Sequence, residues 1–117
     1  MKAMLTVKLE YSDNHKIIQL FKDVAEQLLI KNDGNEGIIK SYENIQLLAP
    51  VEAGDYIEIV GELAAFDCTQ RKIDIEARKV ITHSDEAKGV VGEYLARPVV
   101  VCKAKVICEV PKEKQRG

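Results

Sequence analysis

Acidic and basic side chains that could exchange protons lie at the start and in the middle of one predicted helix. Asp13 and His15 are two residues apart near its first turn, where a carboxylate beside an imidazole could act as acid and base. Asp23 and Glu26 follow inside the helix, and a covering sheet or partner subunit would make them stronger bases. These four residues are the candidate catalytic groups. Ordinary roles are also open to them: Asp13 as a helix N-cap, His15 as a solvated first-turn residue, and Asp23 and Glu26 as parts of a solvated helix face.

Basic side chains later in the chain could bind an anionic ligand. Arg71 and Lys72 lie in or beside a predicted turn, and such groups hold phosphates through charge-assisted hydrogen bonds. The same group of cations is completed by Arg78, Lys79, Lys103 and Lys105. Acidic residues alternate with several of these cations, so charge that only keeps the strand faces soluble is the alternative interpretation.

Tyr42 and Glu43 are neighbours on a predicted strand that faces the helix. Because successive strand residues point to opposite faces, one is expected to pack and the other to face solvent, and a ligand contact is the alternative for both. His15 and His83 lie far apart in the sequence and form no metal-ligand cluster, so no metal is expected.

The hydrophobic pattern predicts one strand, one helix and then four strands. Residues 4–11 alternate apolar and polar, and apolar residues then recur at helical spacing as far as a stop signal at 32–34. This apolar set includes Ile18 and Ile30, so it is wider than a surface helix needs and predicts a largely enclosed helix. The later strands are expected at 37–50, 55–66, 71–82 and 98–110, with a loop at 83–96 and a frayed polar tail after 110.

This β-α-β-β-β-β order predicts a single α+β domain spanning residues 1–117, an antiparallel sheet wrapped around one helix in the hotdog arrangement. A barrel capped by a helix is the alternative with the same elements. Such a thin sheet leaves an edge strand and an apolar flank uncovered, so we expect the chain to form a homodimer or a larger oligomer.

The composition, 46% hydrophobic and 31% charged, is typical of a globular domain. A net charge of −2 gives no basic field to hold nucleic acid, and no apolar run approaches the roughly 20 residues that span a membrane. Neither partner is expected, and the cytoplasm is the expected location. The cysteines, Cys68, Cys102 and Cys108, are expected to be reduced and buried.

Six stretches of the chain together resemble a known family, the hotdog ammonia-lyases of amino-acid fermentation that act on 3-aminobutyryl-CoA and β-alanyl-CoA. The stretches are 13–15, 19–37 with its NDGNEG ending, 47–58 (LLAPVEAGDYIE), 69–72, 75–81 and 98–104 (PVVVCKA). The resemblance implies reversible elimination of ammonia from a 3-aminoacyl-CoA thioester, with coenzyme A as part of the substrate and no further cofactor. It also adds Thr69 to Tyr42, Glu43, Arg71 and Lys72 as expected substrate contacts.

Two departures from the family pattern keep other functions open. The chain is about nine residues short between His15 and the helix, where the family has a Tyr-Gly-Gly-Asn stretch, and Gln27 stands where the family helix carries a glutamate. A catalytically silent subunit that binds acyl-CoA is therefore an alternative to the lyase. An acyl-CoA thioesterase is the third possibility, because this fold does not fix the reaction.

Overall fold

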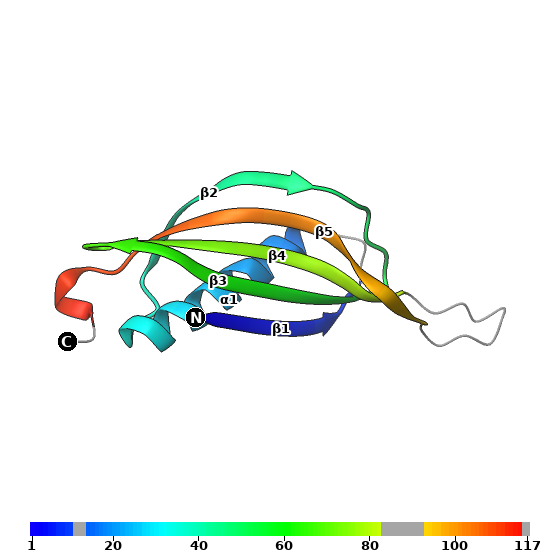
Figure 1. The fold of residues 1–117 in the computed structure, drawn as a ribbon, viewed down its shortest axis with the longest axis horizontal. Coiled ribbons are helices and arrows are strands. Elements are labelled where there is room, and N and C mark those ends of the chain that lie inside the picture. The colour runs from blue at the N-terminus through cyan, green and yellow to red at the C-terminus, as the bar shows by residue number, and fades with distance from the viewer. Residues whose placement is uncertain (11–13, 83–92, 116–117) are drawn as a thin grey trace.

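The computed structural model describes residues 1–10, 14–82 and 93–115, which form one helix and a five-stranded sheet (Figure 1). The elements are β1 (Lys2–Lys8), α1 (Asn14–Asp33), β2 (Ile38–Leu47), β3 (Tyr56–Asp67), β4 (Gln70–Thr82), β5 (Glu93–Glu109) and the 3-10 helix η2 (Lys112–Lys114). The strand order is β1-β3-β4-β5-β2, and all four neighbouring pairs are antiparallel. The predicted α+β arrangement is confirmed.

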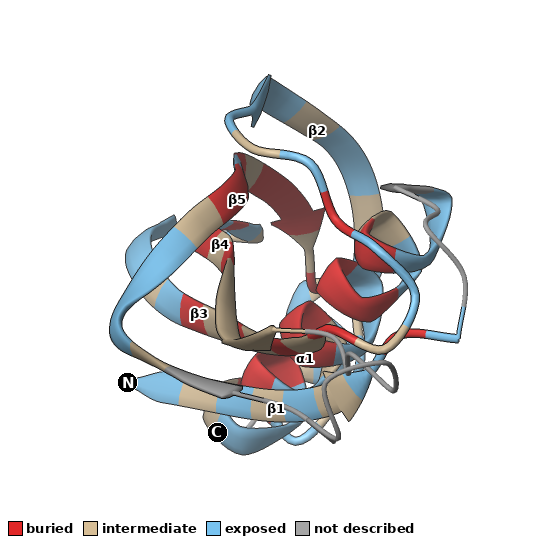
Figure 2. Cartoon of the chain, turned by 90° about the vertical axis from the view of Figure 1, so that its right-hand side faces the viewer, coloured by how far each residue is buried: buried red, intermediate tan, exposed pale blue. Residues whose placement is uncertain are grey.

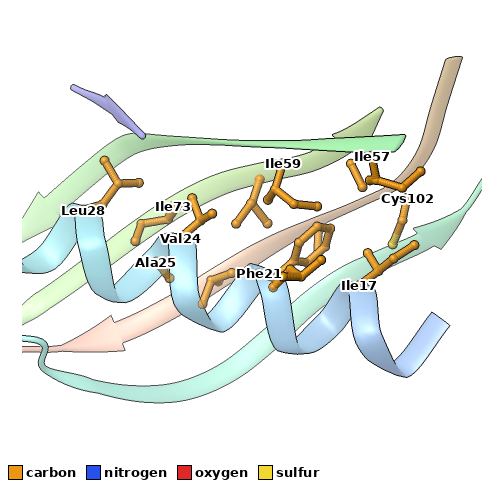
Figure 3. Close-up of a cluster of buried hydrophobic side chains, with 14 of the residues drawn as sticks. Ile17, Phe21, Val24, Ala25, Leu28, Ile57, Ile59, Ile73 and Cys102 are labelled. Atoms are coloured by element: carbon orange, nitrogen blue, oxygen red, sulfur yellow. The ribbon is translucent and has the colours of Figure 1, made fainter. Parts of the chain in front are cut away.

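The sheet curves around α1, and buried residues line the side that faces the helix (Figure 2). From α1, Phe21 and Val24 are fully buried and meet Ile59 of β3 and Ile73 of β4 (Figure 3). Burying each such large side chain stabilises the fold by about 1.5–3 kcal/mol. The buried helix positions are Ile17, Leu20, Phe21, Val24, Ala25, Leu28 and Leu29. Ile30, which was expected in this set, is instead 48% exposed, so the buried face is narrower than the sequence suggested.

Strict alternation places the strand side chains. In β4, Ile73, Ile75 and Ala77 are buried, while Asp74 faces away from the helix and is exposed. Strand β5 buries Cys102, Ala104, Val106 and Cys108, and it departs from the alternation where Val101 and Ile107 are buried as well. The sheet therefore has an apolar inner face toward α1 and a charged outer face.

Gly61 allows the helix to approach the sheet closely. A Cβ atom at this position would lie 2.8 Å from Cγ1 of Val24 and 3.1 Å from Cδ1 of Leu28. Only the absence of a side chain lets α1 pack directly on the β3 backbone here.

Two expectations about irregular segments are wrong. Residues 93–96, expected in a loop, begin β5, because Glu93 pairs with Thr82 and Tyr94 with Ile81 in the ladder with β4. The tail is ordered as far as Gln115, whose Nε2 donates to the Cys68 carbonyl at 2.9 Å and to the Val110 carbonyl at 2.8 Å. The expected loop residues 83–92 and the last two tail residues lie outside the described part of the chain.

Cys102 and Cys108 are buried and free, as expected, but Cys68 is exposed. It lies in the tight turn between β3 and β4, at the end of the sheet, and not in the core. Its φ of 48° is the left-handed conformation that such turns often need.

Candidate functional site

Five polar residues of α1 form a stripe on the side of the helix opposite its buried face. Successive helix residues are rotated by about 100°, so positions spaced by three, four or seven residues share a face. This places on one side of the helix the residues His15, Gln19, Lys22, Asp23 and Glu26, which we call the α1 stripe. All of them are exposed except Glu26, which is half-buried. Three predicted catalytic residues therefore share one face, and the fourth, Asp13, lies outside the described residues.

Tyr42 of β2 lies within electrostatic range of two residues of the α1 stripe. Its side chain is half-buried and packs against the core, and its register partner on β5 is Val106. Burial raises the pKa of the Tyr42 hydroxyl, and the nearby Cys108, Glu26 and Asp23 raise it further. The structure thus places Tyr42 within electrostatic reach of both predicted carboxylates, and its hydroxyl keeps its proton at neutral pH as a hydrogen-bond donor.

The two carboxylates differ in their surroundings. Lys22 Nζ lies 3.8 Å from Glu26 Oε1, one helical turn away, and the Glu26 side chain is 31% exposed. Asp23 is exposed and forms no ion pair with any residue of the described chain. Gln27 is exposed as well. Glu26, which is half-buried and within electrostatic range of Tyr42, is therefore the best placed of the helix carboxylates to act as a base.

A cavity of about 420 Å³ opens at the beginning of α1. It lies between the end of β1 and the first turns of the helix, and its lining residues are Val7, Lys8, Leu9, Glu10, His15, Lys16 and Gln19. Backbone N–H groups without helical partners and the positive end of the helix dipole both favour a negatively charged ligand atom at such a place. Lys8 and Lys16 add positive charge. Sequence reasoning singled out neither lysine, because nothing in their spacing predicts that β1 ends beside the helix.

His15 and Glu26 occupy opposite ends of the same stripe. Eleven residues separate them, and a rise of 1.5 Å per residue puts them about 16 Å apart along the helix axis. They cannot act on adjacent atoms of one substrate within a single chain.

The basic residues predicted to bind phosphate have different positions from those expected. Arg71 is 3% exposed, and its guanidinium forms two hydrogen bonds with the carboxylate of Asp33, at 3.0 and 2.9 Å. It also donates to the carbonyls of Cys68 and Gln70. Its expected role as a phosphate ligand is wrong, because its donors are directed at the helix end and the hairpin.

Other predicted contacts are scattered. Lys79 pairs at 3.2 Å with the fully buried Asp55 and is likewise committed to the fold. Lys72 and Glu43 are exposed, and Glu43 stands opposite Lys105. Thr69 accepts a hydrogen bond at its backbone carbonyl from the Val110 amide. None of these residues is brought to the α1 stripe.

No group of three or more potential metal ligands is found among residues 1–10, 14–82 and 93–115. Within the same residues, no helix is long and apolar enough to cross a membrane.

Comparison with solved structures defines the class of fold. The chain superposes on the beta-alanyl-CoA:ammonia lyase from Clostridium propionicum with a TM-score of 0.90 and 22% identity, covering 100% of this chain and 90% of that one. A hexameric hotdog fold thioesterase of Campylobacter jejuni gives a TM-score of 0.73 at 13% identity, over 97% and 86% of the two chains. The protein has the hotdog fold.

A curated relative then shows the family. The chain is 42% identical over 125 residues to the 3-aminobutyryl-CoA ammonia lyase of Acetoanaerobium sticklandii. This alignment covers 99% of each chain. The protein therefore belongs to the 3-aminobutyryl-CoA ammonia lyase family. The alignment is longer than this chain of 117 residues, so the relative carries residues that this chain lacks. No family model matches the chain.

Proposed function

We propose that the protein is an ammonia-lyase that eliminates ammonia reversibly from a 3-aminoacyl-CoA thioester in the cytoplasm, as one step of amino-acid fermentation. The observation that carries this proposal is 42% identity, along almost the whole of both chains, to the 3-aminobutyryl-CoA ammonia lyase of Acetoanaerobium sticklandii. The α1 stripe supplies carboxylates and Tyr42 of β2 supplies a phenol, and these are the kinds of group such an elimination needs.

In the reaction, the C–H bond at the α-carbon and the C–N bond at the β-carbon break while a C=C bond forms. A base must take the α-proton, the thioester oxygen gains negative charge, and the amine leaves as ammonia. In our proposal Glu26 takes the proton, and the amide N–H groups at the start of α1, beside His15, stabilise the oxygen. The Tyr42 hydroxyl, protonated at neutral pH, donates a hydrogen bond near the reacting carbons.

His15 and Glu26 lie about 16 Å apart along one helix, so they could act on one substrate only if the active site is shared between two subunits. In our proposal a two-fold axis sets the start of one helix beside the middle of its symmetry mate, and the symmetry then forms two such sites, because residue i of one chain meets residue j of the other in both directions. Apolar side chains that are unusually exposed on and after the edge strand β2, Ile45 at 48%, Leu47 at 61% and Leu48 at 52%, support association along this edge.

The test mixes two inactive variants. His15→Ala and Glu26→Gln should each lower the rate of ammonium addition to crotonyl-CoA at least about tenfold to a hundredfold, followed as loss of enoyl thioester absorbance. After joint unfolding and refolding, half of the dimers are mixed and each has one intact site, so roughly a quarter of the wild-type activity should return. Glu36→Gln, an exposed carboxylate beyond the helix, is the matched control and should keep full activity. Failure of the mixture to recover activity would refute the shared site.

The catalytically silent subunit remains the second candidate, because the relative carries residues that this chain lacks and because Gln27 replaces the glutamate expected from the family. It predicts binding of crotonyl-CoA without turnover, measured by calorimetry and by absorbance on the same sample. Release of free coenzyme A from the thioester, detected with a thiol reagent, would instead support the thioesterase.

A further inference from the structure

The cavity at the beginning of α1 holds a carboxylate that the proposed reaction leaves without a role. Of the described residues that line this cavity, Glu10 alone is acidic, and Lys8 and Lys16 are basic. Glu10 is exposed, and among the residues that the structure describes it pairs with neither lysine nor with any other cation. The cavity thus has one free carboxylate beside groups that favour negative charge, so it suits a ligand that carries both signs.

Backbone hydrogen bonds fix the position from which Glu10 reaches the cavity. Leu9, the residue before it, is 2% exposed, and its amide donates to the Asp55 carbonyl at 2.8 Å. The Leu9 carbonyl accepts from the Gly54 amide at 2.7 Å. Asp55 is itself fully buried and pairs with Lys79 at 3.2 Å. The backbone on the N-terminal side of Glu10 is therefore held firmly, and a group that is held in place loses less entropy when it binds a ligand.

The proposed substrate carries both signs close together. A primary amine is protonated at neutral pH, and its three N–H donors form charge-assisted hydrogen bonds with a carboxylate. The thioester oxygen becomes negative during the reaction. Only the α-carbon separates the carbonyl carbon from the carbon that bears the amine, so both groups fit in one cavity of about 420 Å³. The cavity matches such a substrate when the amides at the start of α1 hold the oxygen and Glu10 holds the ammonium group.

We propose that Glu10 binds the 3-ammonium group and so makes the site specific for aminoacyl thioesters over plain acyl thioesters. This assignment rests on the lyase function proposed above. The carboxylate keeps the amine protonated, so when the C–N bond breaks its electron pair goes to nitrogen and ammonia leaves without a further proton transfer. The α-proton goes to the base, and the electrons of the C–H bond form the C=C bond. In the reverse direction Glu10 stabilises the positive charge that develops on nitrogen as ammonia adds to the β-carbon.

The reverse reaction has two substrates, and their kinetics separate this role from a structural one. Glu10→Gln should lower kcat/KM for ammonium at least about tenfold, the usual effect of losing a hydrogen bond to a charged group, and leave the KM for crotonyl-CoA unchanged. A variant that merely distorts the cavity would raise the KM for crotonyl-CoA as well. Glu10→Asp keeps the charge and should recover part of the loss, and Glu36→Gln, also an exposed carboxylate, is the control and should behave as the wild type. Because Glu10 is exposed, the fold should persist, and circular dichroism checks this.

Calorimetric titration tests Glu10 without turnover. In the Glu26→Gln protein, from which the base is removed, 3-aminobutyryl-CoA should bind at least about tenfold more tightly than butyryl-CoA, and adding Glu10→Gln should abolish the difference. If this preference is found but the wild-type protein has no lyase activity, the lyase function fails and the role of Glu10 stands. If the wild type is active and Glu10→Gln keeps its kcat/KM for ammonium, the lyase function stands and the role of Glu10 is refuted. Equal affinity for the two thioesters in the Glu26→Gln protein, or binding of neither, also overturns that role.

Discussion

The buried ion pair between Asp33 and Arg71 should be one of the most sensitive polar contacts of the fold. It joins the last residue of α1 to the start of β4, and both side chains are nearly inaccessible, at 6% and 4% exposure. Removing one partner leaves the other charge buried without compensation, which costs about 3–5 kcal/mol. Single domains have a total unfolding free energy of about 5–15 kcal/mol. Asp33→Ala should therefore remove a large part of the stability, and Arg71→Met should do so too, because it also frees the Cys68 and Gln70 carbonyls.

Urea denaturation followed by circular dichroism measures these losses, at one fixed protein concentration because association adds to apparent stability. The double variant Asp33→Leu/Arg71→Met should be more stable than either single variant, because it leaves no unpaired buried charge. The exposed pair Lys40–Glu109, at 3.0 Å, is the matched control, and Lys40→Ala should cost no more than about 1 kcal/mol. If Asp33→Ala costs as little as Lys40→Ala, the reasoning about burial is refuted.

Three further predictions concern packing, thiol access and pH. Gly61→Ala should destabilise the protein by about 1–3 kcal/mol in the same denaturation assay, because the new methyl group would contact Val24 and Leu28 too closely; an unchanged midpoint would contradict the close approach of α1. In the native protein a thiol reagent should modify Cys68 quickly and leave Cys102 and Cys108 unreacted until urea is added; three fast thiols would show that the core is open. Burial raises the pKa of the Cys108 thiol from 9.0 to about 11, so between these pH values the folded protein keeps a proton that the unfolded chain has lost. The free energy of unfolding should therefore fall as the pH rises from 9 to 11. Cys108→Ala should flatten this part of the stability profile, and an unaltered profile would exclude Cys108 as its cause.

The sequence predicted those elements whose side chains repeat with a clear period. Strand β4 alternates without interruption through Ile73, Ile75 and Ala77, and α1 repeats its apolar residues from Ile17 to Leu29, so both were located correctly. Residues 93–96 have no such period, and they join β5 only because β4 lies beside them. Pairing with a distant strand is a tertiary effect that local sequence does not encode.

The same limit explains the errors at the candidate site. Arg71 and Lys79 look like surface cations from their neighbours in sequence, but each meets a buried carboxylate that is distant along the chain, Asp33 or Asp55. No periodicity in the sequence predicts such a contact. His15, Asp23 and Glu26 were expected on the helix, and helical geometry puts them on one face of it. The involvement of Tyr42 required the fold of β2 over the helix.

The position of the helix carboxylate bears directly on whether this chain is active. One residue along a helix rotates a side chain by about 100°, so Glu26 cannot simply replace a glutamate at position 27. Glu26 is half-buried and within electrostatic range of Tyr42, whereas Gln27 is exposed. In our proposal the α1 stripe faces a second subunit. A base at Glu26 must therefore reach the substrate from that side of the helix. An active protein would require that subunit arrangement, and a chain held as a monomer would lack turnover even with every residue of the stripe intact.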